Sequence, residues 1–311
     1  MRGKEKFMKK RTLLLAAAAA AAMLLGACGS SAQETAQSSA AASSQAAESS
    51  SEAQSSEAEE ASSEAASEAK TSTDGETTVT LAAAASLEYA FTEKIIPAFE
   101  AANPGIKIEG TYDSSGKLQT QIESGLAADI FFSAATKQMT ALDEEGMVQS
   151  DTIKNLLENK IVMILPANSD KSASKFEDIV NFDTIAIGDP ESVPAGQYAK
   201  EALTTLGLWD QVESKLSLGT NVTEVLNWVA EGSADAGIVY ATDAATTDKV
   251  KVVAEAPEGS LAKPVLYPVA QMKATEEKDE ATQKAAKAFY DYICSKDATD
   301  VLASYGFTVN E

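Results

Sequence analysis

Residues 78–102 read TVTLAAAASLEYAFTEKIIPAFEAA, an apolar segment of strand length followed by a segment with helical spacing. Residues 78–82 carry β-branched and small apolar side chains, which favour a buried strand. Between residues 87 and 102 the large apolar side chains recur every four positions, at Leu87, Phe91, Ile95 and Phe99, and share one helix face. The following Asn103-Pro104-Gly105 is expected to end the helix. The stretch therefore predicts a strand, a tight turn and a helix.

The same alternation of apolar strand-length segments and amphipathic helical segments continues through the rest of the sequence. It is typical of an α/β protein with largely parallel sheets. The region from residue 77 to residue 311 is long enough for two lobes, each a mostly parallel sheet flanked by helices. Long strands that pass between the lobes would form a hinge, and residues 161–166 and 265–269 are the candidates.

The composition excludes several classes of function. The 311 residues include 25 Lys and Arg against 47 Asp and Glu, a formal net charge of −22, so nucleic acid is not an expected partner. The chain has no histidine, and two cysteines, Cys28 and Cys294, can form neither a zinc cluster nor a disulfide framework. Without histidine the commonest general base is missing. An enzyme is therefore not expected.

The N-terminal region reads as an export signal followed by a tether. Residues 1–28 combine a basic start with an alanine- and leucine-rich segment too short to span a membrane comfortably. They end in Leu25-Gly26-Ala27-Cys28, which resembles the lipobox of bacterial lipoproteins and implies a lipid on Cys28. Residues 29–76 are almost wholly Ser, Ala, Glu and Gln, so they are expected to be disordered. Together these features predict an extracytoplasmic protein anchored to the cell membrane by lipid.

Four turns of small, mostly neutral residues stand directly before expected helices. They are Ala84-Ala85-Ser86, Asp113-Ser114-Ser115-Gly116, Val193-Pro194-Ala195-Gly196 and Thr220-Asn221-Val222. Each would present backbone N–H groups at the positive end of a helix, which suits an anion. One such turn alone is usually an ordinary cap, so the indication comes from four together. No arginine follows Arg11, and neutral donors would have to hold any anion.

A series of motifs resembles the molybdate-binding proteins of bacterial ABC importers, in order and with similar spacing from about residue 78 to 308. The motifs are AAAASL at 82–87, SSGKL at 114–118, ADIFFSA at 128–134, GDPESVPAGQYAKEAL at 188–203, GIVY at 237–240 with Asp243-Ala244, and YGF at 305–307. The resemblance implies the two-lobed periplasmic-binding-protein fold (type II), which closes on molybdate or tungstate. It also implies that the chain works as a monomer with an ABC permease and ATPase, and needs no cofactor.

The resemblance also implies which residues bind the oxyanion. Ser86 and Ser115 match serines that give hydroxyl and amide donors. Ala195 and Val222 match positions that give a backbone amide, and Tyr240 matches a tyrosine that gives its phenol O–H. The second serine turn reads SSG where SSS is common in the family, which leaves Ser115 matched. The implied layout is residues 77–161 as the first part of lobe 1, residues 162–264 as lobe 2, and residues 265–311 as the return to lobe 1.

Other functions stay open at this point. Sulfate or phosphate binding on the same fold is the nearest alternative. A ferric or other metal-binding protein would need clustered tyrosine, histidine or carboxylate ligands, and only Tyr240 lies in a candidate turn. An adhesin or structural lipoprotein would bind no small ligand. The sequence does not separate molybdate from tungstate.

Overall fold

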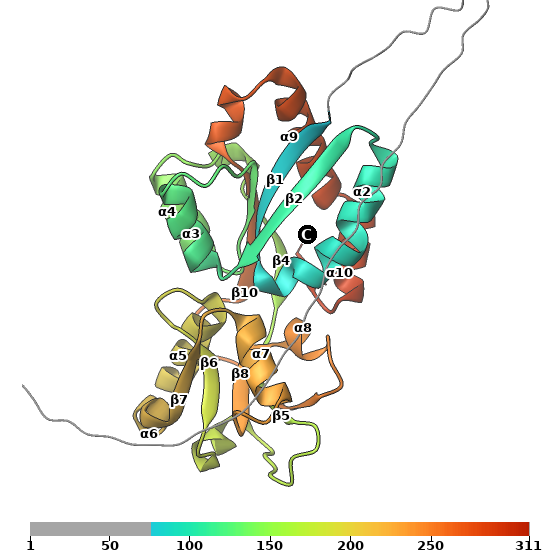
Figure 1. Ribbon diagram of the computed structural model, residues 1–311. Helices are drawn as coiled ribbons and strands as arrows, with labels where there is room; N and C mark the ends of the chain where they lie inside the picture. Colours follow the sequence, from blue (N-terminus) through green and yellow to red (C-terminus); the bar gives the residue numbers. More distant parts are fainter. Residues whose placement is uncertain (1–75, 311) are drawn as a thin grey trace, which may run out of the picture. The chain divides into compact units, whose positions relative to one another are not determined.

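The computed structural model describes residues 76–310, which fall within one compact unit (Figure 1). The predicted signal at residues 1–28, the lipid site at Cys28 and the tether up to residue 75 lie outside these residues. The described residues form two sheets with helices around each. Within them, no helix combines the length and the apolar character that a membrane crossing requires.

The first sheet has the strand order β11-β4-β10-β3-β1-β2 and the second has the order β7-β6-β8-β5-β9. The strands of the first sheet are β1 (Thr77–Ala84), β2 (Ile106–Asp113), β3 (Ile130–Phe132), β4 (Lys154–Asn159), β10 (Val265–Gln271) and β11 (Thr308–Val309). Those of the second are β5 (Ile161–Pro166), β6 (Ile185–Gly188), β7 (Leu216–Gly219), β8 (Ala236–Tyr240) and β9 (Val250–Glu255). Each sheet with its helices forms one lobe, and the predicted two-lobed α/β fold is confirmed.

Both sheets are mixed rather than mostly parallel. In the first, β1 pairs in parallel with β2 and β3, whereas β10 runs antiparallel to β3 and β4, and β11 to β4. In the second, β6 pairs in parallel with β7 and β8, whereas β5 runs antiparallel to β8 and β9. β11, which follows α10 (Lys296–Ser304), pairs antiparallel with β4 at the edge of the first sheet. The other antiparallel pairs arise where the chain enters a sheet from the other lobe, at β5 and β10. No helical crossover precedes these strands to turn them parallel.

Helices pack around both sheets. Those of the first lobe are η1 (Ala85–Leu87), α1 (Glu88–Ala90), η2 (Phe91–Ile95), α2 (Ile96–Ala102), α3 (Ser115–Glu123), α4 (Thr136–Glu144), η3 (Ser150–Thr152), η6 (Lys273–Glu277), α9 (Glu280–Ile293) and α10 (Lys296–Ser304). Those of the second are η4 (Phe176–Asn181), α5 (Pro194–Thr205), α6 (Trp209–Val212), η5 (Glu213–Lys215), α7 (Val222–Ala230) and α8 (Ala241–Ala244).

The predicted helix over residues 87–102 is interrupted in its middle by a π-helical turn, η2. Pro97 lies just beyond this turn, within the first two positions of α2. Proline has no N–H to donate, and its ring collides with the carbonyl four residues earlier. A wider turn at this point accommodates both effects, so the helical stretch continues to Ala102 instead of ending.

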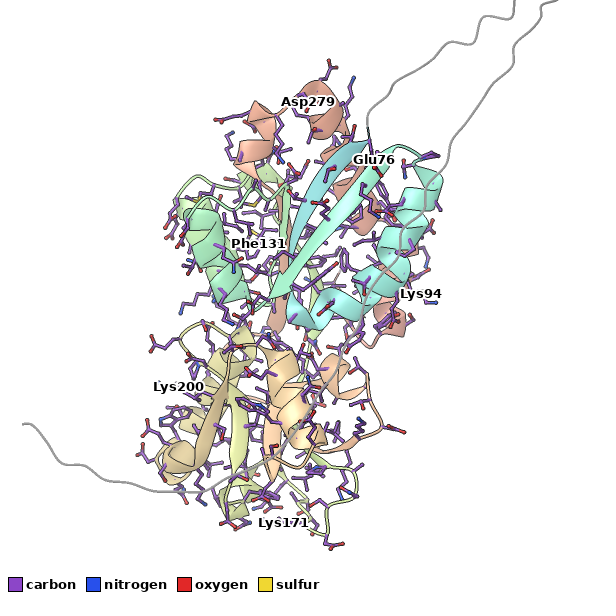
Figure 2. The ribbon with its side chains drawn as sticks, viewed as in Figure 1. Glu76, Lys94, Phe131, Lys171, Lys200 and Asp279 are labelled. Carbon is purple, nitrogen blue, oxygen red and sulfur yellow. The ribbon has the colours of Figure 1, made fainter. Side chains whose placement is uncertain are left out.

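Side chains of β1 alternate between two apolar cores. Val79, Leu81 and Ala83 belong to the larger core, which includes Phe91, Phe99 and Phe289 from the flanking helices. Ala82 points to a smaller core that contains Leu118, Phe131 and Met139. Figure 1 shows the corresponding layers, with α3 and α4 on one face of the sheet and α2, α9 and α10 on the other. Figure 2 shows Phe131 inside the first lobe and Lys94, Lys171 and Lys200 at the periphery.

The chain passes between the sheets at two places. Lys160 alone separates β4 from β5, and residues 256–264 join β9 to β10. The strands proposed as hinge candidates, at 161–166 and 265–269, each lie within a single sheet, so the crossings lie beside them. The backbone of Lys160 is held on both sides, because its N–H donates to Asn159 Oδ1 at 2.8 Å and its carbonyl accepts from the N–H of Ala241 at 2.9 Å.

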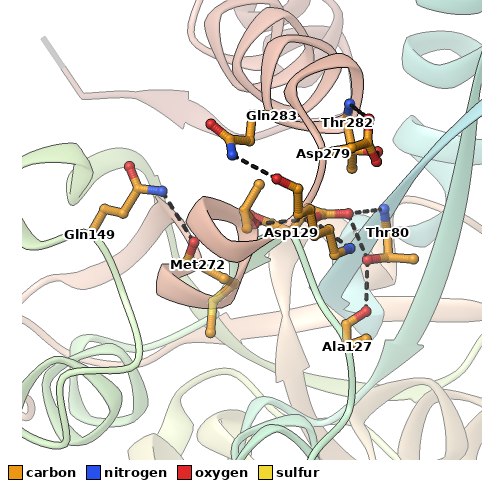
Figure 3. Close-up of polar contacts among 10 residues, drawn as sticks. Thr80, Ala127, Asp129, Gln149, Met272, Asp279, Thr282 and Gln283 are labelled. Atoms are coloured by element: carbon orange, nitrogen blue, oxygen red, sulfur yellow. Dashed lines mark hydrogen bonds and ion pairs between the residues drawn. The ribbon is translucent and has the colours of Figure 1, made fainter.

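A buried carboxylate joins the start of β3 to the return segment of the first lobe (Figure 3). Asp129 is fully buried, and its Oδ2 accepts hydrogen bonds from Thr80 N (2.8 Å) and Thr80 Oγ1 (2.9 Å). Its Oδ1 accepts from Thr275 Oγ1 (2.9 Å) and pairs with Lys278 Nζ (2.7 Å). Because every lone pair is engaged, this network fixes the return segment against β1.

Candidate functional site

The turns between strands and helices line one small cavity between the lobes. The lining residues are Ala84, Ala85, Ser86, Asp113, Ser114, Ser115 and Ala134 from the first lobe, and Val193, Pro194, Ala195, Val222 and Tyr240 from the second. All five residues predicted to bind a ligand, namely Ser86, Ser115, Ala195, Val222 and Tyr240, are among them. The structure therefore brings the predicted set together, and their contact with a ligand stays a prediction.

The parallel part of each sheet explains why these turns converge. In the first sheet Ala84, at the end of β1, pairs with Asp113, at the end of β2. In the second, Gly188 at the end of β6 pairs with Gly219 at the end of β7, and β8 runs in the same direction. The carboxyl ends of parallel strands meet at one sheet edge, which is where open α/β folds bind ligands.

Three helices begin at the cavity. The first residues of α3, α5 and α7 are Ser115, Pro194 and Val222. The side chains of Ala195 and Val222 are apolar and buried, so these two residues can offer a ligand only backbone groups. In the described part of the chain, no side chain caps the first turn of α3 or α5. The positive ends of α3 and α5 therefore stay available to an anion, whereas the side chain of Asn221 already accepts from the N–H of Glu224 in the first turn of α7.

The hydroxyl of Ser115 is arranged to donate into the cavity. Its Oγ accepts a hydrogen bond from the N–H of Ala134 at 2.9 Å, inside the first lobe. A serine hydroxyl has one proton and two lone pairs, so the accepted bond leaves the proton of Ser115 unused.

The hydroxyl of Ser86 lies beside a hydrogen-bonded pair formed by Tyr267 and Asn159. Its Oγ lies 3.0 Å from the Tyr267 hydroxyl, and the Tyr267 hydroxyl lies 3.2 Å from Asn159 Nδ2. An amide nitrogen only donates, so the oxygen of Tyr267 accepts from Asn159. Tyr267 still has one proton and a second lone pair, so either hydroxyl of the Ser86–Tyr267 pair can be the donor. When Ser86 accepts from Tyr267, its own proton is available to a ligand.

Tyr240 contributes a phenol from the second lobe. Its side chain is 1% exposed, and its hydroxyl has no hydrogen-bond partner among the described residues. Its ring packs edge-on against Tyr267, with 5.6 Å between the ring centroids. Burial, followed by the charges that Tyr267, Tyr198 and Asp243 would carry, raises the pKa of Tyr240 well above its usual value. The phenol is therefore a neutral donor without an acceptor.

The cavity contains no positive side chain, since its lining residues include neither lysine nor arginine. The one lining carboxylate, Asp113, accepts from the N–H of Ser114 at 2.7 Å and pairs with Lys117 Nζ at 3.3 Å. Within residues 76–310, no cluster of three histidine, cysteine or acidic side chains could hold a metal ion. The arrangement is suited to an anion held by neutral hydrogen-bond donors from both lobes.

Two features of the site were not predicted from the sequence. Ser114 lines the cavity beside Ser115 with a buried hydroxyl, although only Ser115 was expected to do so. The lobes also contact each other directly. The N–H of Gly116 donates to the carbonyl of Ser192 at 3.0 Å, and Asn159 Nδ2 donates to Thr242 Oγ1 at 2.8 Å. The motif SSG was the available signal for Gly116, because glycine allows backbones to approach closely.

Comparison with known proteins identifies the family. A family model described as bacterial extracellular solute-binding protein matches residues 79–308. The chain belongs to this family. The solute-binding protein is 40% identical over 241 residues to "Putative ABC transporter substrate-binding lipoprotein YvgL" of Bacillus subtilis (strain 168), which covers 78% of the chain and 90% of that relative. It is 39% identical over 237 residues to the molybdate-binding protein ModA of Escherichia coli (strain K12). This match covers 74% of the chain and 89% of that relative.

A solved structure supports the fold of this solute-binding protein. The periplasmic molybdate-binding protein of Azotobacter vinelandii superposes with a TM-score of 0.64 at 21% identity, covering 75% of this chain and all of that chain. The family recognised from the sequence motifs is thereby confirmed. Members of this family bind solutes for transport outside the cytoplasm, which agrees with the expectation that the chain is not an enzyme.

Proposed function

We propose that this protein captures molybdate or tungstate and delivers it to an ABC permease and its ATPase. The observation that carries the proposal is the single cavity lined by Ser86 and Ser115 from one lobe and by Ala195, Val222 and Tyr240 from the other. These five residues offer neutral donors, and the motifs that contain them resemble those of molybdate-binding relatives. The relatives named above include a molybdate-binding protein at 39% identity.

The donor set is energetically sufficient for a dianion. A hydrogen bond to a charged group contributes roughly 1.5–3 kcal/mol net. Five donors, each at the low end of this range, would give about 8 kcal/mol, which corresponds to a micromolar dissociation constant. The acidic surface of the chain opposes this weakly, because charges more than about 8–10 Å away are screened at physiological salt.

The proposal extends to how the protein is placed in the cell. We expect cleavage before Cys28 and a lipid on its sulfur, so that residues 29–76 hold the folded part away from the membrane. The sequence Leu25-Gly26-Ala27-Cys28 supports this, and one relative at 40% identity is named a lipoprotein. The protein is expected to work as a monomer, with the oxyanion as its ligand and no cofactor.

Ligand-induced stabilisation of the full-length protein tests the proposed function. Molybdate or tungstate should raise the melting temperature, and at a hundred times the dissociation constant the stabilisation should be about 2.7 kcal/mol. Sulfate at hundredfold excess over molybdate should neither stabilise the protein nor displace molybdate in calorimetric titration. Absence of any shift with both metal oxyanions would refute the assignment. Equal competition by sulfate would instead indicate a general oxyanion-binding protein.

A further inference from the structure

Ser114 brings a second hydroxyl without a hydrogen-bond partner to the cavity. It belongs to the first lobe, whereas Tyr240 belongs to the second. Its side chain is 4% exposed, and it lines the same cavity as Ser115. Six buried side-chain N or O atoms in residues 76–310 have no hydrogen-bond partner. Ser114 Oγ and the Tyr240 hydroxyl are the two of these that belong to cavity-lining residues. One comes from each lobe.

The position of Ser114 in the fold makes its free hydroxyl unusual. It is the N-cap residue of α3, where a serine side chain ordinarily accepts from an N–H of the first turn. Within the described residues it makes no such bond. Its backbone is fully engaged, because its N–H donates to Asp113 Oδ1 at 2.7 Å and its carbonyl accepts from Leu118 N at 3.0 Å. The hydroxyl alone is left without a hydrogen-bond partner within residues 76–310.

A second serine in the same chain shows the ordinary behaviour. Ser295 is the N-cap of α10, a helix of nine residues like α3. Its Oγ accepts a long hydrogen bond from the N–H of Ala298 at 3.5 Å and donates to the carbonyl of Tyr292 at 2.6 Å. The two serines occupy the same position on helices of equal length, yet only Ser295 caps its helix. The difference indicates that the hydroxyl of Ser114 serves the cavity.

We infer that Ser114 is a further hydrogen-bond donor to the bound oxyanion, in addition to Ser86, Ser115 and Tyr240. This inference rests on the proposed function. A buried hydroxyl without a partner is unfavourable, and an anion in the cavity supplies the acceptor that the protein lacks. Ser114 and Ser115 then donate from successive residues of one turn, and Tyr240 donates across from the other lobe.

The matched substitutions Ser114→Ala and Ser295→Ala, made in the full-length protein, test the inference. Calorimetric titration with molybdate should show a dissociation constant about tenfold to a hundredfold higher for Ser114→Ala, the loss expected for one bond to a charged acceptor. The melting temperature of the ligand-free Ser114→Ala protein should equal or exceed that of the wild type, because no capping bond is removed and an unpartnered buried hydroxyl is lost. Ser295→Ala should lower the melting temperature of the ligand-free protein and leave the dissociation constant unchanged.

The outcomes separate this inference from the proposed function. If the wild-type protein binds molybdate and Ser114→Ala binds it equally well, the inference is wrong and the proposed function stands. If Ser114→Ala lowers the melting temperature of the ligand-free protein without changing the affinity, Ser114 is a structural cap and the inference is again wrong. If the wild-type protein binds neither molybdate nor tungstate, the proposed function fails, and the assignment of Ser114 fails with it.

Discussion

The N–H of Gly116, in α3 of the first lobe, donates a 3.0 Å hydrogen bond to the carbonyl oxygen of Ser192, just before α5 of the second lobe. A Cβ atom on residue 116 would lie 2.3 Å from that oxygen and 2.8 Å from Ser192 Cα. Contacts this short do not occur, so the two backbones meet only because residue 116 has no side chain. The pair therefore limits how closely the lobes approach beside the cavity.

Gly116→Ala should weaken ligand binding while leaving the ligand-free protein as stable as the wild type or more so. Alanine favours a helix over glycine by about 0.5–1 kcal/mol, and its methyl group would hold the lobes apart at Ser192. We expect a faster dissociation of molybdate and a larger radius of gyration of the bound form by solution scattering. Gln121→Ala, an exposed change on the same helix, is the control and should alter neither quantity. An unchanged dissociation rate for Gly116→Ala would show that closure does not depend on this contact.

Ser86→Ala and Ser115→Ala should each reduce the affinity for the oxyanion by roughly 1–3 kcal/mol, because each removes a hydroxyl proton directed to the cavity. Their effects on the ligand-free protein should differ. Ser115→Ala leaves the buried N–H of Ala134 without its acceptor, and should lower the free energy of unfolding by about 1–3 kcal/mol. Ser86→Ala leaves Tyr267 still bonded to Asn159 and should cost less. Urea denaturation and calorimetric titration of both variants give the two quantities, and full affinity in both would place the ligand elsewhere.

Tyr240→Phe should separate stability from binding. The substitution removes a buried hydroxyl that has no partner in the described part of the chain and keeps the ring against Tyr267. The free energy of unfolding should stay the same or rise, since an unsatisfied polar atom is lost. Molybdate should dissociate faster with little change in the association rate, because the bond from the second lobe forms after capture by the first. Stopped-flow measurement of both rate constants checks this, and a slower association alone would contradict it.

The sequence predicted the convergence of the candidate turns better than it predicted the sheets. The turns after β1 and β6 carry small residues at the ends of clearly apolar strands, so the place of each turn at the carboxyl edge of its sheet follows from general rules. By contrast, β4 reads KNLLEN and has only two apolar residues. It becomes a strand because β10 and β11 pair with it on either side, which are contacts made by residues more than a hundred positions away. Local propensity does not contain that information.

The hydrogen-bond directions at the site also depend on distant partners. The Ser86 hydroxyl shares a hydrogen bond with Tyr267, which also accepts from Asn159, and these residues are separated from Ser86 by 181 and 73 positions. The difference between Ser114 and Ser115 is set by Ala134, which lies 19 residues beyond Ser115. A sequence motif can place two serines in a turn. Only the tertiary structure shows which of them already has a partner.

The buried carboxyl of Asp243 should make the free energy of unfolding depend on pH. Burial raises the pKa of this carboxyl to about 8, and its Oδ2 has no partner among residues 76–310. The titratable groups that it influences are the phenols of Tyr240 and Tyr267. In the unfolded chain the carboxyl ionises near pH 4. Between about pH 4 and pH 8 the unfolded protein has therefore released a proton that the folded protein keeps. The contribution of Asp243 to the free energy of unfolding consequently falls as the pH rises, by about 1.4 kcal/mol per unit.

Asp243→Asn should remove this dependence, because an amide does not ionise in either state. The free energy of unfolding of the variant, relative to the wild type, should increase from pH 5 to pH 8 by several kcal/mol, about 4 at most. Urea denaturation at pH 5, 6, 7 and 8 measures the difference at each value. Asp248→Asn, an exposed change a few residues further along, controls for the loss of one acidic residue. If the difference between Asp243→Asn and the wild type stays constant over this range, Asp243 is already ionised in the folded protein. A negative charge would then lie in the same buried cluster as Tyr240, where the site is proposed to hold a dianion.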